Sequence, residues 1–151
     1  MAARYRLGLG RRVVNRIVRA LLRLGWGPAA TYLLVVPGRR SGALRSTPVT
    51  LVKDAGRRWL VAPYGEVAWV RNLRTAGRAT LSRRGHVEEI TVREVGVEEA
   101  APVLRMYVTR VPITRPYFDV TPESDLDAFC AEAPRHPVFT VITATRGTLR
   151  P

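Results

Sequence analysis

Apolar residues recur at helical spacing near the start of the chain. Residues 12–24 read RVVNRIVRALLRL, with arginines grouped on the side opposite to the apolar one. Five apolar residues share one side: Val13, Val14, Ile17, Leu21 and Leu24. The pattern predicts a basic amphipathic helix that ends at Gly25. Two interpretations stay open: the apolar stripe covers the protein core while the arginines are solvated, or the helix lies on an anionic membrane surface.

Short apolar and alternating runs follow this helix and predict β-strands. The strands are expected at Tyr32–Val36, Thr47–Lys53, Arg58–Ala62, Ala79–Ser82, Val87–Val95 and Val138–Thr143. The tripeptide DAG between the second and third strands is a hairpin signal, and a further turn is expected at RRG before the fifth. Neighbouring strands are therefore predicted to pair as antiparallel hairpins.

Helices are expected between these groups of strands. The segment VAWVRNLRTAG, residues 67–77, has apolar residues at helical spacing and a stop at Gly77. A second helix is expected over Glu98–Arg110, with Pro102 no later than its first turn. The sequence SDLD, residues 124–127, resembles a capping box and predicts a third helix that ends near Pro134. The proline-containing segment Val111–Glu123 is expected to be a lid or a crossing loop.

This order of elements predicts an α+β fold, a small and mostly antiparallel sheet or barrel with flanking helices. A chain of 151 residues fits one domain. Within it we expect residues 1–28 to form the basic helical segment and residues 29–151 the cofactor-binding barrel.

Positive charge is concentrated in the first third of the chain. The net charge is +13, and residues 1–53 contain eleven basic residues and no Asp or Glu. This third is expected to seek an anion, whether nucleic acid, a lipid headgroup or a small phosphorylated ligand. No nucleic-acid recognition motif is evident, so nucleic acid is the weakest of the three.

Metal chemistry and nucleophilic catalysis have little support in the sequence. Cys130 is the only cysteine, and the two histidines show no zinc-ligand spacing. His136 is predicted to be a structural or surface residue. No apolar run approaches the ~18 residues of a membrane span. We therefore expect a cytoplasmic protein, or a peripheral one at the inner face of the membrane if residues 12–24 bind lipid.

The segment PGRRSGALRS, residues 37–46, has the composition of an anion-binding loop. Its glycines allow backbone N–H groups to turn toward a ligand, and its side chains supply hydroxyl donors and forked guanidinium groups. It is not a P-loop, because no Lys-Ser/Thr pair follows the second glycine. A solvated turn in an arginine-rich protein is the open alternative. With few acid–base candidates nearby, a bound cofactor is expected to carry the chemistry.

Three motifs in order, GRRSGALRSTPV, WLVAPYG and WVRNLR, resemble those of the deazaflavin-dependent nitroreductase and quinone reductase family. The resemblance implies a split β-barrel of the flavin-binding type, with coenzyme F420 as the cofactor. It departs from the family in Pro63, where serine is frequent, and in the short EVA segment before Trp69. FMN therefore stays open as the alternative cofactor.

The resemblance also implies roles for individual residues. The coenzyme's phosphate and acidic tail would be bound by Arg39, Arg40, Ser41, Gly42 and Arg45. Its ring would be lined by Pro48, Val49, Ala62, Pro63, Tyr64 and Gly65, and supported by Trp69, Asn72, Leu73 and Arg74. Tyr107 and Tyr117 would line the substrate or donate a proton, although aromatic residues at such positions also serve simply as packing.

The implied reaction is hydride transfer from reduced F420 to a planar, electron-poor and hydrophobic acceptor, a quinone or a nitro compound. Two alternatives remain: an FMN- or haem-binding barrel, and a basic protein that binds membrane or nucleic acid without catalysis. A homodimer is an open alternative to a monomer.

Overall fold

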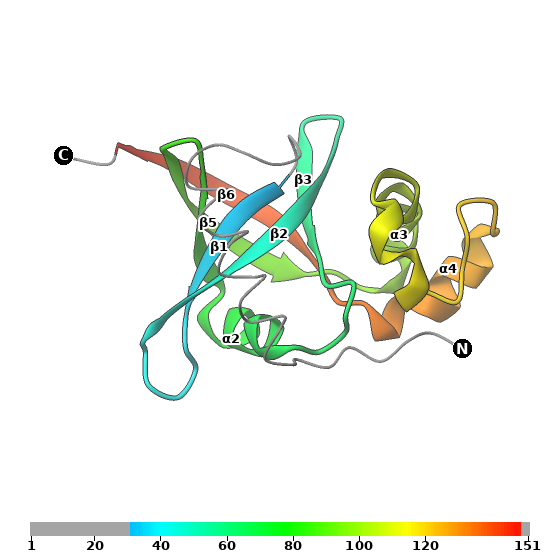
Figure 1. The fold of residues 1–151 in the computed structure, drawn as a ribbon, viewed down its shortest axis with the longest axis horizontal. Helices are drawn as coiled ribbons and strands as arrows, with labels where there is room; N and C mark the ends of the chain where they lie inside the picture. Colours follow the sequence, from blue (N-terminus) through cyan, green and yellow to red (C-terminus); the bar gives the residue numbers. More distant parts are fainter. Residues whose placement is uncertain (1–30, 149–151) are drawn as a thin grey trace.

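A computed structural model describes residues 31–148 as a closed antiparallel barrel with flanking helices (Figure 1). The strands are β1 (Thr31–Pro37), β2 (Leu44–Asp54), β3 (Arg57–Val61), β4 (Arg78–Arg83), β5 (His86–Glu94) and β6 (Val138–Thr148). Around the barrel they follow the order β1-β2-β3-β6-β5-β4. The predicted α+β class, antiparallel pairing and strand positions are confirmed, with the last strand longer than expected. The predicted helix at residues 12–24 lies outside the described residues.

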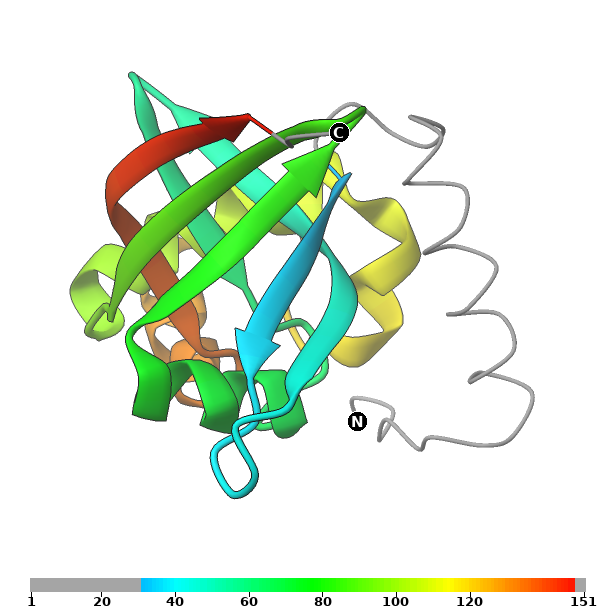
Figure 2. The same ribbon diagram turned by 90° about the vertical axis from the view of Figure 1, so that its left-hand side faces the viewer.

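Two tight hairpins lie at one end of the barrel, here called the rear end. Ala55 and Gly56 join β2 to β3 with φ values of 48° and 78°, and Arg84 and Gly85 join β4 to β5 with 50° and 76°. Two successive positive φ values define a turn whose twist matches the flanking strands. The turn signals DAG and RRG are therefore confirmed. Figure 2 shows these hairpins at the upper end of the barrel and α2 at the lower, front end.

Helix α2 (Ala68–Ala76) covers the front end of the barrel. Its apolar side is fully buried at Val70 and Leu73, which join the side chains that fill the barrel. Gly77 ends the helix in the left-handed conformation, at φ 65°, and its N–H donates to the Leu73 carbonyl at 2.8 Å. The barrel core is Leu34, Val36, Val49, Leu51, Leu60, Val70, Leu73, Leu81, Ile90, Val92 and Phe139, with smaller residues between them.

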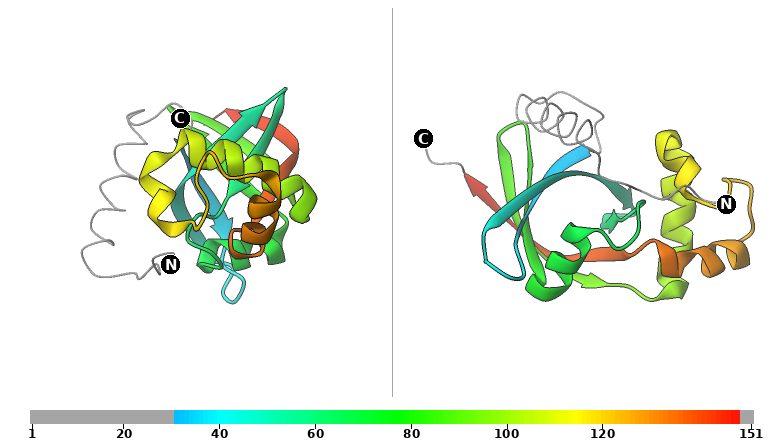
Figure 3. Two further views of the ribbon diagram at one scale, coloured as in Figure 1. Left: turned by 90° about the vertical axis from the view of Figure 1, so that its right-hand side faces the viewer. Right: turned by 60° about the horizontal axis from the view of Figure 1, so that its bottom comes forward.

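A second core lies outside the barrel, where α3 (Val97–Arg110) packs against β2 and β3, and α4 (Leu126–Glu132) packs against α3 (Figure 3). Alternation along β3 serves both cores, because Leu60 faces the barrel core while Trp59 and Val61 face the helices. This second core also includes Val103, Leu104, Tyr107, Val108, Phe118 and Phe129. Two 3-10 helices, η1 (Pro112–Tyr117) and η2 (Ala133–Arg135), complete this side.

Three local expectations were wrong. Pro102 is the sixth residue of α3 rather than a first-turn residue. Because proline has no N–H, the Glu98 carbonyl lacks its helical hydrogen-bond donor. Both residues are exposed, so water can replace the lost bond. The third helix is capped by Asp125 instead of Ser124, with its carboxylate accepting the Ala128 N–H at 2.8 Å. The segment expected to be irregular contains η1.

None of the helices described within residues 31–148 is long and apolar enough to cross a membrane.

Replacing Gly77 with alanine tests the left-handed stop of α2. The added methyl group has open space around it, so the cost comes from the backbone conformation alone. We expect Gly77→Ala to lower the free energy of unfolding by about 1–2 kcal/mol, measured by urea denaturation. The control is Gly96→Ala, which also has open space but sits at φ −76°. Equal losses for the two variants would contradict the backbone explanation.

Candidate functional site

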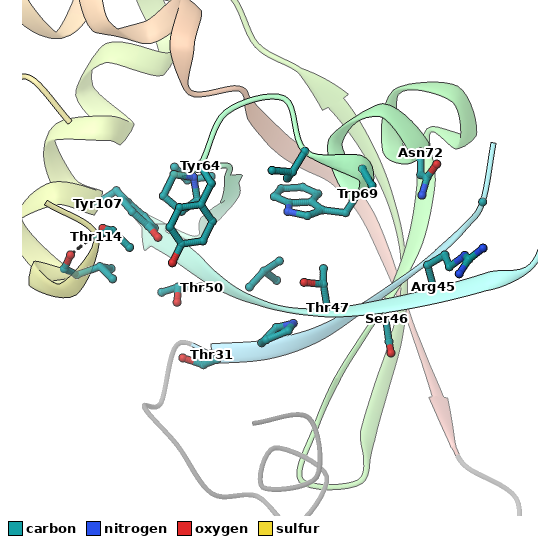
Figure 4. A pocket seen from close by; sticks show the side chains of 18 of the residues that line it. Thr31, Arg45, Ser46, Thr47, Thr50, Tyr64, Trp69, Asn72, Tyr107 and Thr114 are labelled. Carbon is teal, nitrogen blue, oxygen red and sulfur yellow. Dashed lines mark hydrogen bonds between the residues drawn. The ribbon is translucent and has the colours of Figure 1, made fainter. Parts of the chain in front are cut away.

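A pocket of about 540 Å³ runs along β2, between α2 on one side and the C-terminal part of α3 on the other. We call it the front pocket. Eleven of the residues implicated by sequence line it: Arg39, Arg40, Ser41, Arg45, Pro48, Val49, Pro63, Tyr64, Trp69, Asn72 and Tyr107. Figure 4 shows Arg45 and Asn72 at one end of this pocket, Tyr107 and Thr114 at the other, and Tyr64 and Trp69 between them. The structure thus brings together side chains from five separate segments.

The loop between β1 and β2, residues 38–43, holds its shape through its own backbone. The Gly38 N–H donates to the Ala43 carbonyl at 2.8 Å, and the Gly42 N–H donates to the Gly38 carbonyl at 2.9 Å. Ser41 accepts the Ala43 N–H at 3.2 Å, and Gly42 takes φ 72°. The N–H groups of Gly38 and Gly42 are therefore bonded within the loop and do not face a ligand. The guanidinium groups of the loop are exposed and available to an anion.

A buried amide fixes this loop to α2. Asn72 is 4% exposed, and its Oδ1 accepts the Arg39 backbone N–H at 3.1 Å and the Arg39 Nη1–H at 2.9 Å. A bond from a charged donor to a neutral acceptor orients the guanidinium without neutralising it. Arg39 therefore keeps its positive charge and its remaining N–H donors beside the pocket.

The end of the front pocket next to the β1–β2 loop carries positive charge. Arg39, Arg40 and Arg45 line it, and the lining residues that the structure describes include no Asp or Glu. All three arginines are exposed to solvent, so their field reaches an approaching anion. An anionic group bound there would meet several guanidinium forks at once, which is the arrangement that favours phosphate and carboxylate.

The middle and the opposite end of the pocket are aromatic. Tyr64 contacts Tyr117 edge to face, with ring centroids 4.7 Å apart, and Trp69 packs near Phe139 at 6.3 Å. Tyr107 is 2% exposed, and burial raises the pKa of its phenol well above the ordinary value, with hydrogen bonding by Thr114 opposing the shift. The Tyr107 phenol is therefore a weak acid that stays neutral and can donate a hydrogen bond.

Six predicted residues do not line the pocket. Ala62 and Leu73 are fully buried in the barrel core, and Gly42 and Gly65 occupy turns at φ 72° and 85°. Arg74 pairs with Glu94 at 2.6 Å and with Glu66 at 2.7 Å. Tyr117 contacts Tyr64 from behind. These residues lie outside the pocket lining and can help to hold it in place.

Several lining residues escaped sequence reasoning. They are Thr31, Thr47, Thr50, Val61, Val67, Ala68, Val111, Ile113 and Thr114, whereas Gly38 and Ser46 belong to the anion-binding segment already implicated. Thr47 and Thr50 flank the Pro48-Val49 pair on β2, so their position next to these two implicated residues could have indicated them. Ile113 and Thr114 carried no such signal, because η1 reaches the pocket only through the packing of α3.

A buried acid and histidine lie behind the aromatic wall. Glu132 and His136 are 2% and 4% exposed, and His136 Nε2 lies 2.7 Å from Glu132 Oε1. Burial lowers the pKa of His136, and the Glu132 carboxylate opposes that shift. The His136 ring also stacks on Phe118 at 3.9 Å. His136 is thus a structural residue, and the surface alternative is wrong.

Comparison with known proteins matches this geometry to a family. The family model described as F420H(2)-dependent quinone reductase matches residues 10–121. No curated protein matches the chain at a significant level.

Solved structures share the fold at low sequence identity. An F420-H2 dependent reductase, FDR-A, is 21% identical, with 76% of this chain and 95% of that chain covered and a TM-score of 0.55. A chain described as a domain-swapped dimer is 19% identical, with 88% and 99% covered and a TM-score of 0.54. A heme binding protein from Mycobacterium smegmatis is 13% identical, with 84% and 56% covered and a TM-score of 0.52. One barrel therefore serves proteins described by different ligands.

Removing the buried amide tests how the loop is held. Asn72→Ala deletes the acceptor shared by the Arg39 N–H and guanidinium, so we expect a loss of about 1–3 kcal/mol in unfolding free energy. Hydrogen exchange at the Arg39 amide should also accelerate, while the Gly42 amide, bonded within the loop, should change little. The control is Thr75→Ala on the exposed side of α2. Unchanged exchange at Arg39 would show that the loop does not depend on Asn72.

Proposed function

Because the chain belongs to the F420H(2)-dependent quinone reductase family, we propose that it transfers a hydride from reduced F420 to a quinone held in the front pocket. The protein is an F420-dependent oxidoreductase by family membership. The observation that carries the rest of the proposal is the pocket's division into an arginine end and an aromatic end.

The residues present fit the coenzyme. F420 has a phosphate and an acidic tail at one end and a planar deazaflavin ring at the other. Three guanidinium groups with no carboxylate beside them in the described lining suit the anionic end of the coenzyme. The wall of Pro63, Tyr64 and Trp69 suits its ring. When bound, the reduced coenzyme supplies the hydride, and the protein supplies position and charge.

Arg40 and Arg45 are assigned to the anionic part of the coenzyme. Neither has a carboxylate neighbour in the pocket lining, so each can give forked hydrogen bonds to phosphate or carboxylate oxygens. Arg39 is assigned to the same anion, with its orientation set by Asn72. Ser41 contributes to the shape of the loop, since its hydroxyl accepts a backbone N–H.

Tyr107 is assigned a hydrogen-bonding role toward the acceptor. Hydride addition to a quinone places negative charge on a carbonyl oxygen, and a neutral phenol can stabilise that oxygen by donating a hydrogen bond. The raised pKa of Tyr107 disfavours full proton transfer from it, and we assign the product's proton to water. Tyr117 supports the wall by packing on Tyr64.

Nitro compounds are the second class of acceptor, because they are also planar and electron-poor. FMN is less favoured as the cofactor, since the matched family is defined by F420.

Purified protein should be titrated with F420 while the ring fluorescence is followed. The reduced form should then be mixed with menadione or a nitroaromatic compound. Faster turnover of the nitroaromatic would overturn the quinone assignment, and binding without turnover of either would leave a carrier role.

Charge removal tests the arginine end of the pocket. We expect Arg40→Ala combined with Arg45→Ala to weaken F420 binding at least tenfold, about 1.4 kcal/mol, because two forked cation contacts are lost. The matched control combines Arg78→Ala with Arg93→Ala, which removes the same charge from exposed positions outside the pocket. Fluorescence titration measures both. If the two pairs weaken binding equally, the effect is one of total charge, and these arginines do not form the site.

A tyrosine substitution separates hydrogen bonding from acid catalysis. We expect Tyr107→Phe to lower kcat/KM for menadione by about tenfold or less, the loss typical of one hydrogen bond. A general acid would cost roughly 100-fold or more. The control is Tyr32→Phe, which removes a phenol at the rear end of the barrel that bonds Lys53. A loss above 100-fold at Tyr107 alone would identify it as the proton donor.

A further inference from the structure

A second pocket, of about 400 Å³, lies at the rear end of the barrel. We call it the rear pocket. It shares no lining residue with the front pocket. Five of its ten lining residues are lysine or arginine, against 25 of 151 in the whole chain. An arginine-rich composition therefore does not by itself account for this density of positive charge.

The barrel topology gathers these cations. β1 begins and β6 ends at the rear end, and both tight hairpins turn there (Figure 2). Charged residues at these strand ends therefore meet around one opening: Lys53, Arg58, Arg83, Arg84 and Arg146. The lining also includes Leu81, which is 1% exposed. The result is a hollow with an apolar residue buried in its wall and a cationic rim.

Among the described residues, one carboxylate lines the rear pocket, and it is already engaged. Glu88 forms a bidentate pair with Arg58, with N–O distances of 2.8 and 3.4 Å. Within the described residues, Lys53 and Arg146 have no carboxylate partner, so part of the positive charge of this lining is left without a balancing acid. Like charges this close raise the energy of the folded state unless an anion accompanies them.

Neutral contacts hold two of these cations in place. Lys53 Nζ donates to the Tyr32 hydroxyl at 2.6 Å and lies 4.9 Å from the centroid of that ring. Arg83 Nη1 donates to the Thr31 carbonyl at 2.8 Å. Such bonds fix the side chains without cancelling their charge, so little side-chain entropy is left to lose when an anion binds.

We propose that the rear pocket is a second anion site, which binds a group with phosphate chemistry and at least two negative charges. Guanidinium and ammonium groups arranged around a hollow match the oxygens of such a group from several sides. The phosphate belongs either to a small free molecule or to a lipid headgroup. The site is separate from the coenzyme pocket and does not depend on the proposed reductase activity.

Pyrophosphate is the probe for the test. Isothermal titration should be run on full-length protein saturated with F420, so that the front arginines are occupied, and repeated on the Arg40→Ala, Arg45→Ala background. The rear variant combines Lys53→Gln with Arg146→Gln, and the matched control combines Arg78→Gln with Arg93→Gln. We expect the rear variant to weaken pyrophosphate binding at least tenfold and the control to change it less than twofold.

Two further measurements complete the test. Arg146→Glu reverses one exposed charge and should give the same loss if the double variant does not fold. Flotation with vesicles of phosphatidylglycerol and phosphatidylcholine separates the two sources of phosphate. A rear variant that loses both pyrophosphate and vesicle binding indicates a lipid headgroup, and one that loses pyrophosphate alone indicates a free molecule. Equal behaviour of the rear and control variants, with diffuse weak binding in both, would overturn the proposal.

Discussion

Pairing of β1 with β4 closes the barrel, and the placement of both pockets depends on that closure. Leu34 lies opposite Leu81 in this pairing, and both side chains are buried in the barrel core. Closure brings the β1–β2 loop to the same end as α2, where Asn72 can reach Arg39. It also gathers the two hairpins, the start of β1 and the end of β6 at the other end. A closed barrel has no free strand edge, so its two ends remain for ligands.

The front pocket combines a cationic surface with an aromatic one. Arg39 is held by the neutral amide of Asn72, which leaves its charge uncompensated, while Glu66 and Glu94 are engaged by Arg74. The aromatic wall is in turn supported from behind by Tyr117 and by the second core. An amphipathic coenzyme with a charged tail and a flat ring needs both surfaces within one molecular length.

Burial divides the ionisable groups into structural and functional ones. Glu132 and His136 Nε2 pair beside the second core, and Arg135 adds a further ion pair to Glu132. This arrangement stabilises the segment that backs Gly65, whose Cα faces the Arg135 carbonyl. Tyr107 is buried without a charged partner, so it remains a neutral hydrogen-bonding group at the pocket. The chemistry assigned to the protein is therefore positional, and electron transfer is left to the coenzyme.

The sequence by itself determined the strands, both tight turns, the end of α2 at Gly77 and the arginines of the loop, because periodicity and turn chemistry depend on neighbouring residues. It also carried the three motifs by which the family could be suspected. Only the tertiary structure decided that Asn72 holds Arg39 across 33 positions, that Thr114 joins the pocket and that Glu132 is buried beside His136. It also showed that the loop's glycine N–H groups are bonded internally. These features depend on strand register and barrel closure, which bring distant residues together, and no local pattern records such contacts.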